Sequence, residues 1–342
     1  MNTFATVCWI LLGVAMSGAH AATVENLHTA SVPVLDGSDL EFANGLGAAF
    51  EIVLVKLTGD SASLKQASLR KLVARATHYN TAFGYENAAD GSLHLRADFD
   101  LPAVSGALRE RGLKVWGKDR PTLAASLVVA DATGRTLSPS EMNRAIFEAF
   151  VATAAQRAVP LRRPVTDTKL ANLVANAVTD EEMLEGLVSA LVPMGTPVIL
   201  IGIVRQQDAA TWQGRWRLEL AEAPSEWTTT GPLPVPLVTE GVNRAVDTIS
   251  RHFSALATAS GDSVVRLTVA GIVTADDYGR VLNYLATLDP VAKLGVRRVF
   301  GSQVEFELQT DGGLASVAQV IGFGEVLTPS PDNPTLYQLN SL

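Results

Sequence analysis

The sequence predicts an α+β protein of three small modules, in which mixed and antiparallel sheets pack against helices. Pro197–Val204 is an uninterrupted apolar run of strand length, which is typical of a strand buried on both faces. After the polar segment Gln206–Gly214, apolar and polar side chains alternate strictly over Arg215–Leu220, as in a strand with one buried face. We expect this hairpin at the centre of a sheet, with its second strand at or near an edge. Elsewhere, strand patterns recur between amphipathic helices, which predicts the other two modules.

Residues 1–21 have the pattern of a secretory signal peptide. Phe4–Met16 is apolar apart from Thr6, and it is too short to span a bilayer comfortably. Ala19 and Ala21 place small residues at the −3 and −1 positions of a cleavage site. We therefore expect cleavage after Ala21 and a periplasmic mature chain. The alternative is an uncleaved membrane anchor, because the segment contains no Lys or Arg.

Composition narrows the classes of function. Cys8 is the only cysteine and lies inside the expected signal segment, so the mature chain has no thiol for a nucleophile, a disulfide or a metal site. The net charge of −8 argues against a nucleic acid partner, because nucleic acid binding needs a basic surface. No other apolar run is long enough to span a bilayer, so we expect no membrane span in the mature chain.

Residues 22–118 are expected to form an amino-terminal α+β domain. Apolar residues recur at three- and four-residue spacing from Leu40 to Leu57, which predicts a helix that Asp36 or Ser38 caps and Gly59 ends. The other expected elements are a strand over Val24–Val34, a helix over Ser63–Ala76, strands over Tyr79–Tyr85 and Leu93–Phe99, and a helix over Leu101–Arg111.

Residues 119–260 are expected to form a middle domain around the hairpin. The long closing helix, Leu237–Thr258, carries one apolar face, and Ser138 or Ser140 is a candidate cap for an earlier helix. The other expected elements are strands over Leu123–Ala130 and Glu226–Thr230, and helical segments over Glu141–Arg157, Asp167–Ala177 and Met183–Leu191. This order fits a mixed sheet with helices on one or both faces.

Residues 261–329 follow the order strand, helix, strand, strand, helix, strand. The strands are expected over Ser263–Ile272, Val291–Val299, Gln303–Leu308 and Glu325–Thr328, and the helices over Tyr278–Leu288 and Gly313–Ile321. That order is typical of a ferredoxin-like module. Residues 330–342 combine prolines with several amide side chains, and we expect them to form a mostly disordered tail.

Two short motifs link the chain to a known family. Trp116-Gly-Lys-Asp-Arg-Pro121 follows the amino-terminal elements, and Gly214-Arg-Trp-Arg-Leu218 lies in the second part of the hairpin. With the signal segment, this arrangement resembles the uncharacterised proteobacterial family known as domain of unknown function 2066, from about Val24 to about Pro329. The resemblance implies an exported protein but no activity, because the family has none established. Ala125-Ser126 departs from the family pattern, in which another Trp is expected.

The residue types that carry enzyme chemistry are scattered. The mature chain has four histidines, His28, His78, His94 and His252. None lies within metal-ligand spacing of another, so we expect neither a metal site nor a cofactor. Paired acids at Asp180–Glu182 and Asp276-Asp277 begin expected helices, where capping explains them better than catalysis. No nucleophile elbow, acylation motif or phosphate-binding loop occurs in a supporting context, so we expect no catalytic residues and no enzyme.

Three residues are candidates for contact with a ligand or a partner. Trp116 and Arg120 belong to the first motif, and we expect Arg120 to pair with an acid across a domain junction. Trp212 lies among polar residues in the hairpin turn, where an exposed indole can stack on a ligand. The competing interpretation of these aromatic residues is ordinary sheet packing, which Trp216 fits by its inward position.

Three hypotheses about function follow. The first is a non-catalytic accessory or scaffold protein of the cell envelope, which offers sheet edges and inter-domain grooves to an envelope protein partner. The alternative is a periplasmic binding module for a glycan, a peptide or a small ligand, with Trp212 and the groove near Trp116–Pro121 as the expected sites. An enzyme ranks third, because the sequence shows no set of acid, base and nucleophile that would converge on one site.

Overall fold

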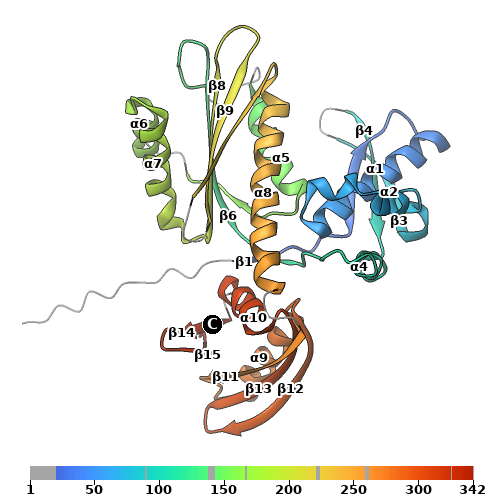
Figure 1. The fold of residues 1–342 in the computed structure, drawn as a ribbon, viewed down its shortest axis with the longest axis vertical. Coiled ribbons are helices and arrows are strands. Elements are labelled where there is room, and N and C mark those ends of the chain that lie inside the picture. The colour runs from blue at the N-terminus through green and yellow to red at the C-terminus, as the bar shows by residue number, and fades with distance from the viewer. Residues whose placement is uncertain are drawn as a thin grey trace, which may run out of the picture.

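The computed structural model describes residues 21–88, 91–137, 143–165, 168–220, 224–258, 262–324 and 326–341. Helices pack against mixed and antiparallel sheets in three modules, which meet beside the long helix α8, Pro234–Thr258 (Figure 1). The predicted α+β class is therefore confirmed. Residues 1–20, which carry most of the expected signal peptide, lie outside the described ranges. Within those ranges no helix is both long and apolar enough to cross a membrane.

The amino-terminal module is built on a three-stranded antiparallel sheet in the order β2-β4-β3, formed by Thr29–Pro33, Leu93–Phe99 and Asn80–Asn87. Helix α1, Asp39–Thr58, lies against the sheet because its apolar stripe faces the strands. Ser38 caps α1 by accepting the N–H of Glu41, and Gly59, at a φ of 67°, ends it, as predicted. The smaller elements are the 3-10 helix η1, Ser61–Lys65, and the helices α2, Ala67–Val73, α3, Ala76–Tyr79, and α4, Leu101–Arg109.

The middle module contains a five-stranded mixed sheet in the order β10-β9-β8-β6-β7. Its strands are β6, Leu123–Ala130; β7, Leu161–Arg162; β8, Val198–Gln206; β9, Trp212–Leu220; and β10, Ser225–Gly231. β8 takes the central place, and β9 is one strand from the edge, so the predicted position of the hairpin is confirmed. β6 runs parallel to β8, whereas β9 runs antiparallel to it.

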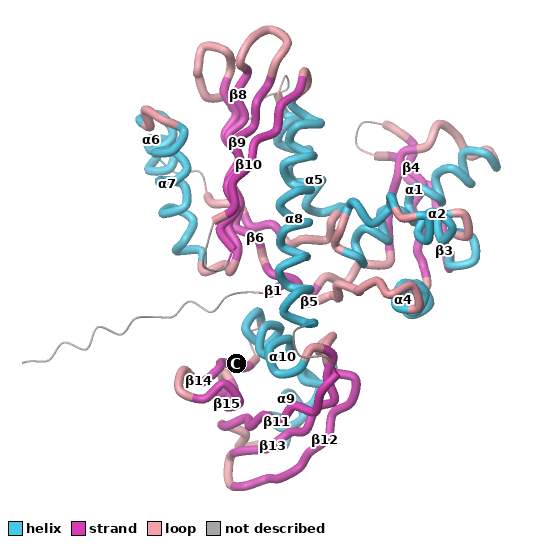
Figure 2. The backbone as a smooth tube through the Cα atoms, in the orientation of Figure 1, coloured by secondary structure: helices cyan, strands magenta, loops and turns pink. Residues whose placement is uncertain are grey.

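Helices cover both faces of this sheet (Figure 2). Helices α5, Arg144–Gln156, and α8 lie on one face, and α6, Thr168–Asn176, and α7, Asp180–Leu191, lie on the other; the 3-10 helix η2, Val192–Met194, follows α7. Burial from both sides explains the continuous apolar run of β8, since residues 198–204 are all buried. The candidate caps Ser138 and Ser140 lie outside the described residues.

The carboxyl-terminal module has a five-stranded sheet in the order β12-β13-β11-β15-β14. Its elements are β11, Asp262–Ala270; α9, Ala275–Thr287; β12, Val291–Phe300; β13, Gln303–Asp311; α10, Gly313–Phe323; β14, Leu327–Ser330; and β15, Asn333–Leu339. The first three strands have the order expected of a ferredoxin-like sheet. β15 then pairs parallel with β11, in the place that the fourth strand would take, and β14 lies at the edge instead.

The expected disordered tail at residues 330–342 is therefore wrong over most of its length. Residues 333–339 form β15, in which Tyr337 is 1% exposed and Leu339 is 7% exposed. Pairing with β11 and β14 gives the backbone of this segment its hydrogen bonds. The prolines that suggested disorder do not interrupt the ladder, because Pro331 lies in the turn and Pro334 lies near the start of the strand.

A short ribbon lies where the modules meet. β1, Ala21–Thr23, pairs antiparallel with β5, Asp119–Pro121, so the beginning of the described chain lies beside the Trp116–Pro121 motif. Helix α10 of the carboxyl-terminal module packs against both strands of the ribbon. The motif that sequence analysis singled out is therefore placed at the contact between modules.

Candidate functional site

Arg120 lies at the centre of the contact between the amino-terminal and middle modules, with its side chain fully buried. Its guanidinium donates hydrogen bonds of 2.6 to 3.3 Å to five backbone carbonyl groups, those of Lys56, Trp116, Gly117, Arg157 and Ala158. These carbonyls come from α1, from the segment that leads to β5 and from the end of α5. One side chain therefore holds three separate chain segments together.

The expected pairing of Arg120 with an acid is wrong, since all five of these hydrogen bonds go to carbonyl oxygens. Burial, together with the charge of Arg157, lowers the pKa of Arg120 to about 9, so the guanidinium stays charged at neutral pH. The carbonyl dipoles supply the negative partner that a buried cation requires. The ion pair beside Arg120 lies within the middle module, between Arg157 and Asp247 of α8, at 2.6 Å.

Trp116 is the aromatic partner of Arg120. The guanidinium carbon lies 4.1 Å from the centroid of the indole, a cation–π contact that covers one face of the ring. The backbone N–H of Trp116 donates to the carbonyl of Leu57 at 2.6 Å, which ties the motif to the end of α1. A Cβ at Gly59 would lie 2.7 Å from the indole, so glycine is needed there for space as well as for its positive φ.

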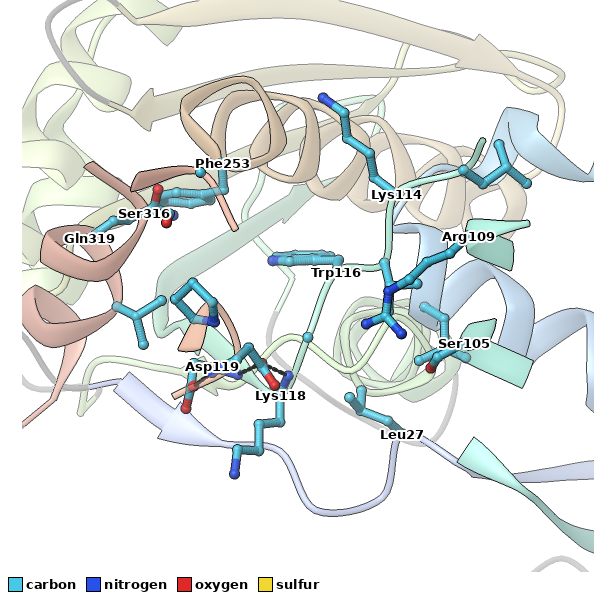
Figure 3. A pocket seen from close by; sticks show the side chains of 18 of the residues that line it. Leu27, Ser105, Arg109, Lys114, Trp116, Lys118, Asp119, Phe253, Ser316 and Gln319 are labelled. Atoms are coloured by element: carbon cyan, nitrogen blue, oxygen red, sulfur yellow. Dashed lines mark hydrogen bonds between the residues drawn. The ribbon is translucent and has the colours of Figure 1, made fainter. Parts of the chain in front are cut away.

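A cavity of about 510 Å³ opens beside Trp116, and we call it the junction cavity (Figure 3). All three modules contribute to its wall, which is mainly apolar. The apolar lining includes Leu27, Leu57, Leu113, Trp116, Phe253 and Val320. A volume of this size falls within the range of roughly 300–1,000 Å³ that is typical of small-molecule sites.

Two aspartates, Asp119 of β5 and Asp289 of the turn before β12, lie on the wall of the junction cavity. The carboxylate of Asp289 accepts the backbone N–H of Lys118 at 2.5 Å and that of Asp119 at 3.3 Å. In return, the carboxylate of Asp119 accepts the N–H of Asp289 at 3.4 Å. Gly117 leaves the space that Asp289 occupies, because a Cβ there would overlap the carboxylate. This reciprocal pairing docks the carboxyl-terminal module onto the motif.

Asp119 has a pKa that is unusually high for an aspartate. Burial, followed by the negative charge of Asp289, raises the pKa of Asp119 to about 6. The buried hydroxyl of Tyr284 has no hydrogen-bond partner within the described part of the chain, and burial together with the Asp119 charge raises its pKa. The contact can therefore take up a proton near pH 6. Among its described residues, the cavity wall carries neither histidine nor cysteine.

Trp212 belongs to a different part of the structure. It is the first residue of β9 and pairs with Gln206 of β8 and Gly231 of β10, so the expected position in a turn is wrong. Its side chain is half-buried and packs against the core of the middle module. Trp216, which is fully buried and stacks on Trp227, confirms sheet packing for that residue. The structure therefore places Trp116 and Arg120 together and leaves Trp212 apart.

The paired acids at the helix starts act as predicted. Thr179 caps α7 by accepting the N–H of Glu182, and Thr274 and Asp277 form a reciprocal capping box at the start of α9. Asp180 pairs with Arg205 of β8 at 2.6 Å. A group of three or more His, Cys, Asp and Glu side chains in metal-binding geometry does not occur in the described ranges.

Sequence analysis missed the residues that the other modules bring to the cavity. Phe253 comes from the last turns of α8, and Asp289 and Val320 come from the carboxyl-terminal module. The local signal at Asp289 was an acid in a turn before Pro290, which ordinary turn chemistry also explains. Only the arrangement of the modules shows that Asp289 lies on the wall of the cavity.

Comparisons with known proteins give little beyond this geometry. Residues 21–117 match a family model described as a domain of unknown function, DUF8605. This match does not test the resemblance to the domain of unknown function 2066 family, which stays a prediction. No curated protein matches the chain significantly.

Two solved structures are similar to parts of the chain. The Protein Y N-terminal domain of Thermus thermophilus shares 8% identity over 38% of this chain and 94% of its own, with a TM-score of 0.19. The hypothetical protein CT253 of Chlamydia trachomatis shares 9% identity over 39% of this chain and 99% of its own, with a TM-score of 0.26. Similarities this weak say nothing about the site.

Proposed function

We propose that the protein is a non-catalytic accessory protein of the cell envelope that binds a small ligand in the junction cavity. The observation that carries this proposal is the wall of the cavity, to which three modules contribute both apolar side chains and polar or charged ones. Ligand sites of this form lie preferentially where domains meet. The expected groove near Trp116–Pro121 coincides with this cavity, which favours a small ligand over a glycan stacked on Trp212.

The polar groups of the cavity support binding rather than catalysis. The carboxylates of Asp119 and Asp289 accept backbone N–H groups across the module contact, so they are committed to docking. The hydroxyl of Ser316 donates to the carbonyl of Gly313. A hydrolytic site would need a nucleophile hydrogen-bonded to a general base, and these described contacts do not form one.

The proposed periplasmic location rests on the pattern of residues 1–21. Cleavage after Ala21 would leave Ala22 and Thr23 paired with Arg120 and Asp119, so the mature chain would keep most of the ribbon. Cell fractionation with amino-terminal sequencing of the isolated protein tests this part of the proposal. A chain that keeps residues 1–21 would contradict cleavage.

Ligand binding is tested by filling the cavity. We expect the wild-type protein to bind 1-anilinonaphthalene-8-sulfonate, an apolar fluorophore, with saturable fluorescence enhancement. Val320→Trp places a large side chain into the space from α10 and should abolish this binding, because Val320 lines the cavity. Ala315→Trp is the matched control, since Ala315 is exposed on the same helix.

The two variants separate the possible results. Retained binding in Ala315→Trp with loss in Val320→Trp supports the junction cavity as the site. Equal binding by both variants and the wild type would contradict it, because the fluorophore would then bind elsewhere. Circular dichroism of each variant shows whether the carboxyl-terminal module is still folded.

A scaffold role is a second candidate, and the edge strand β3 favours it. Phe83 is 56% exposed and Tyr85 is 41% exposed on this strand, and the Phe83 ring lies 4.6 Å from that of Phe42. An apolar patch beside a free strand edge suits strand addition by a partner protein. A photocrosslinking residue at Tyr85 should capture one envelope protein reproducibly in cells, whereas one at exposed Arg163 should not. Equal capture at both positions would contradict this role.

A further inference from the structure

Basic side chains gather at the junction cavity, although the chain as a whole is acidic. Arg109, Lys114 and Lys118 line the cavity, against the two acids Asp119 and Asp289. The chain carries 27 Lys and Arg and 35 Asp and Glu, so cations are the minority elsewhere. An excess of positive charge on the wall of an apolar cavity selects for an anionic group on the ligand.

The acids of the wall are already occupied, whereas Arg109 is available. Asp289 accepts two backbone N–H groups and Asp119 accepts one, as described above. The side chain of Arg109 makes neither a hydrogen bond nor an ion pair with the described residues, and it is exposed at the end of α4. Figure 3 shows its guanidinium directed toward the space beside Trp116. A guanidinium presents a planar fork of donors that matches a carboxylate or a phosphate.

The rest of the wall suits an apolar body. Leu27 and Leu57 from the amino-terminal module face the same cavity as Phe253 of α8 and Val320 of α10. These side chains offer no hydrogen-bond donors or acceptors, so a sugar or a polar peptide would leave its own polar groups unpaired against them. An unbranched acyl or alkyl chain carries no such groups.

From this division of charge and apolar surface, we infer that the junction cavity binds a single-chain amphiphile, with its apolar chain against Leu27, Leu57, Phe253 and Val320 and its anionic head on Arg109. This inference rests on the proposed function, because it names the ligand class of the same cavity. It predicts that head-group charge, rather than chain length alone, decides the affinity.

Three amphiphiles with one chain length test the inference by isothermal titration of the mature full-length protein below their micelle concentrations. Dodecanoate is anionic, dodecyl maltoside is neutral and dodecyltrimethylammonium is cationic. We expect dodecanoate to bind at least about tenfold more tightly than the other two, because only its head pairs with Arg109. Its affinity should fall as salt is raised, since the mouth of the cavity is open to solvent.

Arg109→Gln removes the charge while keeping a polar side chain, and it should weaken dodecanoate binding about tenfold while leaving dodecyl maltoside unchanged. Arg111→Gln is the matched control, because Arg111 is also exposed but does not line the cavity. Equal affinity for the three amphiphiles, combined with loss of binding in Val320→Trp, would overturn the head-group inference and leave the cavity as the site. If no amphiphile and no fluorophore binds, the proposed function fails as well.

Discussion

At the scale of single residues, Arg120 shows how a buried cation is held without a carboxylate. Five carbonyl oxygens surround its guanidinium. Two of them belong to Arg157 and Ala158, and Ala158 has a φ of 53°, which is uncommon for a residue other than glycine. The turn after α5 thus adopts a strained backbone while it directs carbonyl groups at Arg120. Strain of this kind persists only where the surrounding contacts hold it.

Replacing the guanidinium of Arg120 should lower the stability of the folded protein. Arg120→Met keeps much of the volume but leaves five carbonyl groups of three segments without their donor, so we expect a loss of unfolding free energy on the order of 3 kcal/mol. Urea unfolding followed by circular dichroism measures it. Arg163→Met, at an exposed position, should change stability by less than about 0.5 kcal/mol. Similar losses in the two variants would show that the carbonyl network is not stabilising.

At the scale of elements, the central hairpin depends on the fit of one indole. Trp216 of β9 lies over Gly202 of β8 and against Gly241 of α8, and a Cβ at either glycine would overlap its ring. The indole N–H donates to Thr229 Oγ1 at 2.9 Å, so the buried ring has its polar partner. Helix α8 therefore approaches the sheet closely at Gly241.

Two glycine variants test this close approach. Gly241→Ala should destabilise the protein by roughly 2 kcal/mol, because the added methyl group overlaps Trp216 in a packed core. Gly279→Ala, within α9 and with open space around its Cβ position, should stabilise by roughly 0.5–1 kcal/mol through helix propensity. Thermal unfolding of both variants checks the opposite signs. Stabilisation by both would show that the sheet and α8 adjust freely.

Local sequence patterns predicted most helices and strands. The features that they missed depend on contacts with residues that lie far away in the sequence. The hairpin was predictable because its alternation and its apolar run report burial directly, residue by residue. β15 was missed because its prolines and amides resemble a tail, and its burial depends on β11, which lies far away in the sequence. Of the candidate site, Trp116 and Arg120 were identified from a motif, whereas Asp289 lies 170 residues from Asp119 and carries no signal of its own.

Truncation before β15 tests whether residues 333–339 are part of the folded carboxyl-terminal module rather than a disordered tail. A chain that ends at Ser330 loses Tyr337 and Leu339 from the carboxyl-terminal core and exposes the edge of β11. We expect a lower melting temperature and rapid proteolysis of this module. Gln338→Ser is the control, since Gln338 is an exposed residue of the same strand. A truncated chain that melts like the full chain would restore the interpretation of a disordered tail.

At the scale of the whole molecule, polar contacts hold the modules together. Arg120 joins the amino-terminal and middle modules, as do the hydrogen bonds from Arg157 to the carbonyl of Gly59 and from Ser61 to Asp247. Asp119 with Asp289 joins the carboxyl-terminal module to the motif between them. Arg120, with a pKa of about 9, stays charged at neutral pH. The contact of Asp119 with Asp289 differs, because the pKa of Asp119 is raised to about 6 and its charge changes within the physiological range.

Docking of the carboxyl-terminal module should therefore weaken as pH rises. Folded Asp119 keeps its proton up to about pH 6, whereas the unfolded chain releases it near 3.8, so folding takes up a proton between these values. The contribution of Asp119 to stability is complete below about pH 4 and is lost as pH rises through about 6. Asp119→Asn stays neutral and can still accept the N–H of Asp289. Its melting temperature should equal that of the wild type near pH 4 and exceed it at pH 7.

Asp36→Asn supplies a control of opposite sign. The pKa of exposed Asp36 is lowered by its hydrogen bonds with Ser38, so its contribution is present above the unfolded pKa and lost as pH falls. This variant should be slightly less stable than the wild type at pH 7 and equal to it in acid. Melting curves of Asp119→Asn that stay parallel to the wild type from pH 4 to 8 would contradict the raised pKa. A difference in melting temperature that opens between pH 4 and pH 7, with Asp119→Asn the more stable, would instead show that the contact of the carboxyl-terminal module at the junction cavity loosens more readily at neutral pH than in mild acid.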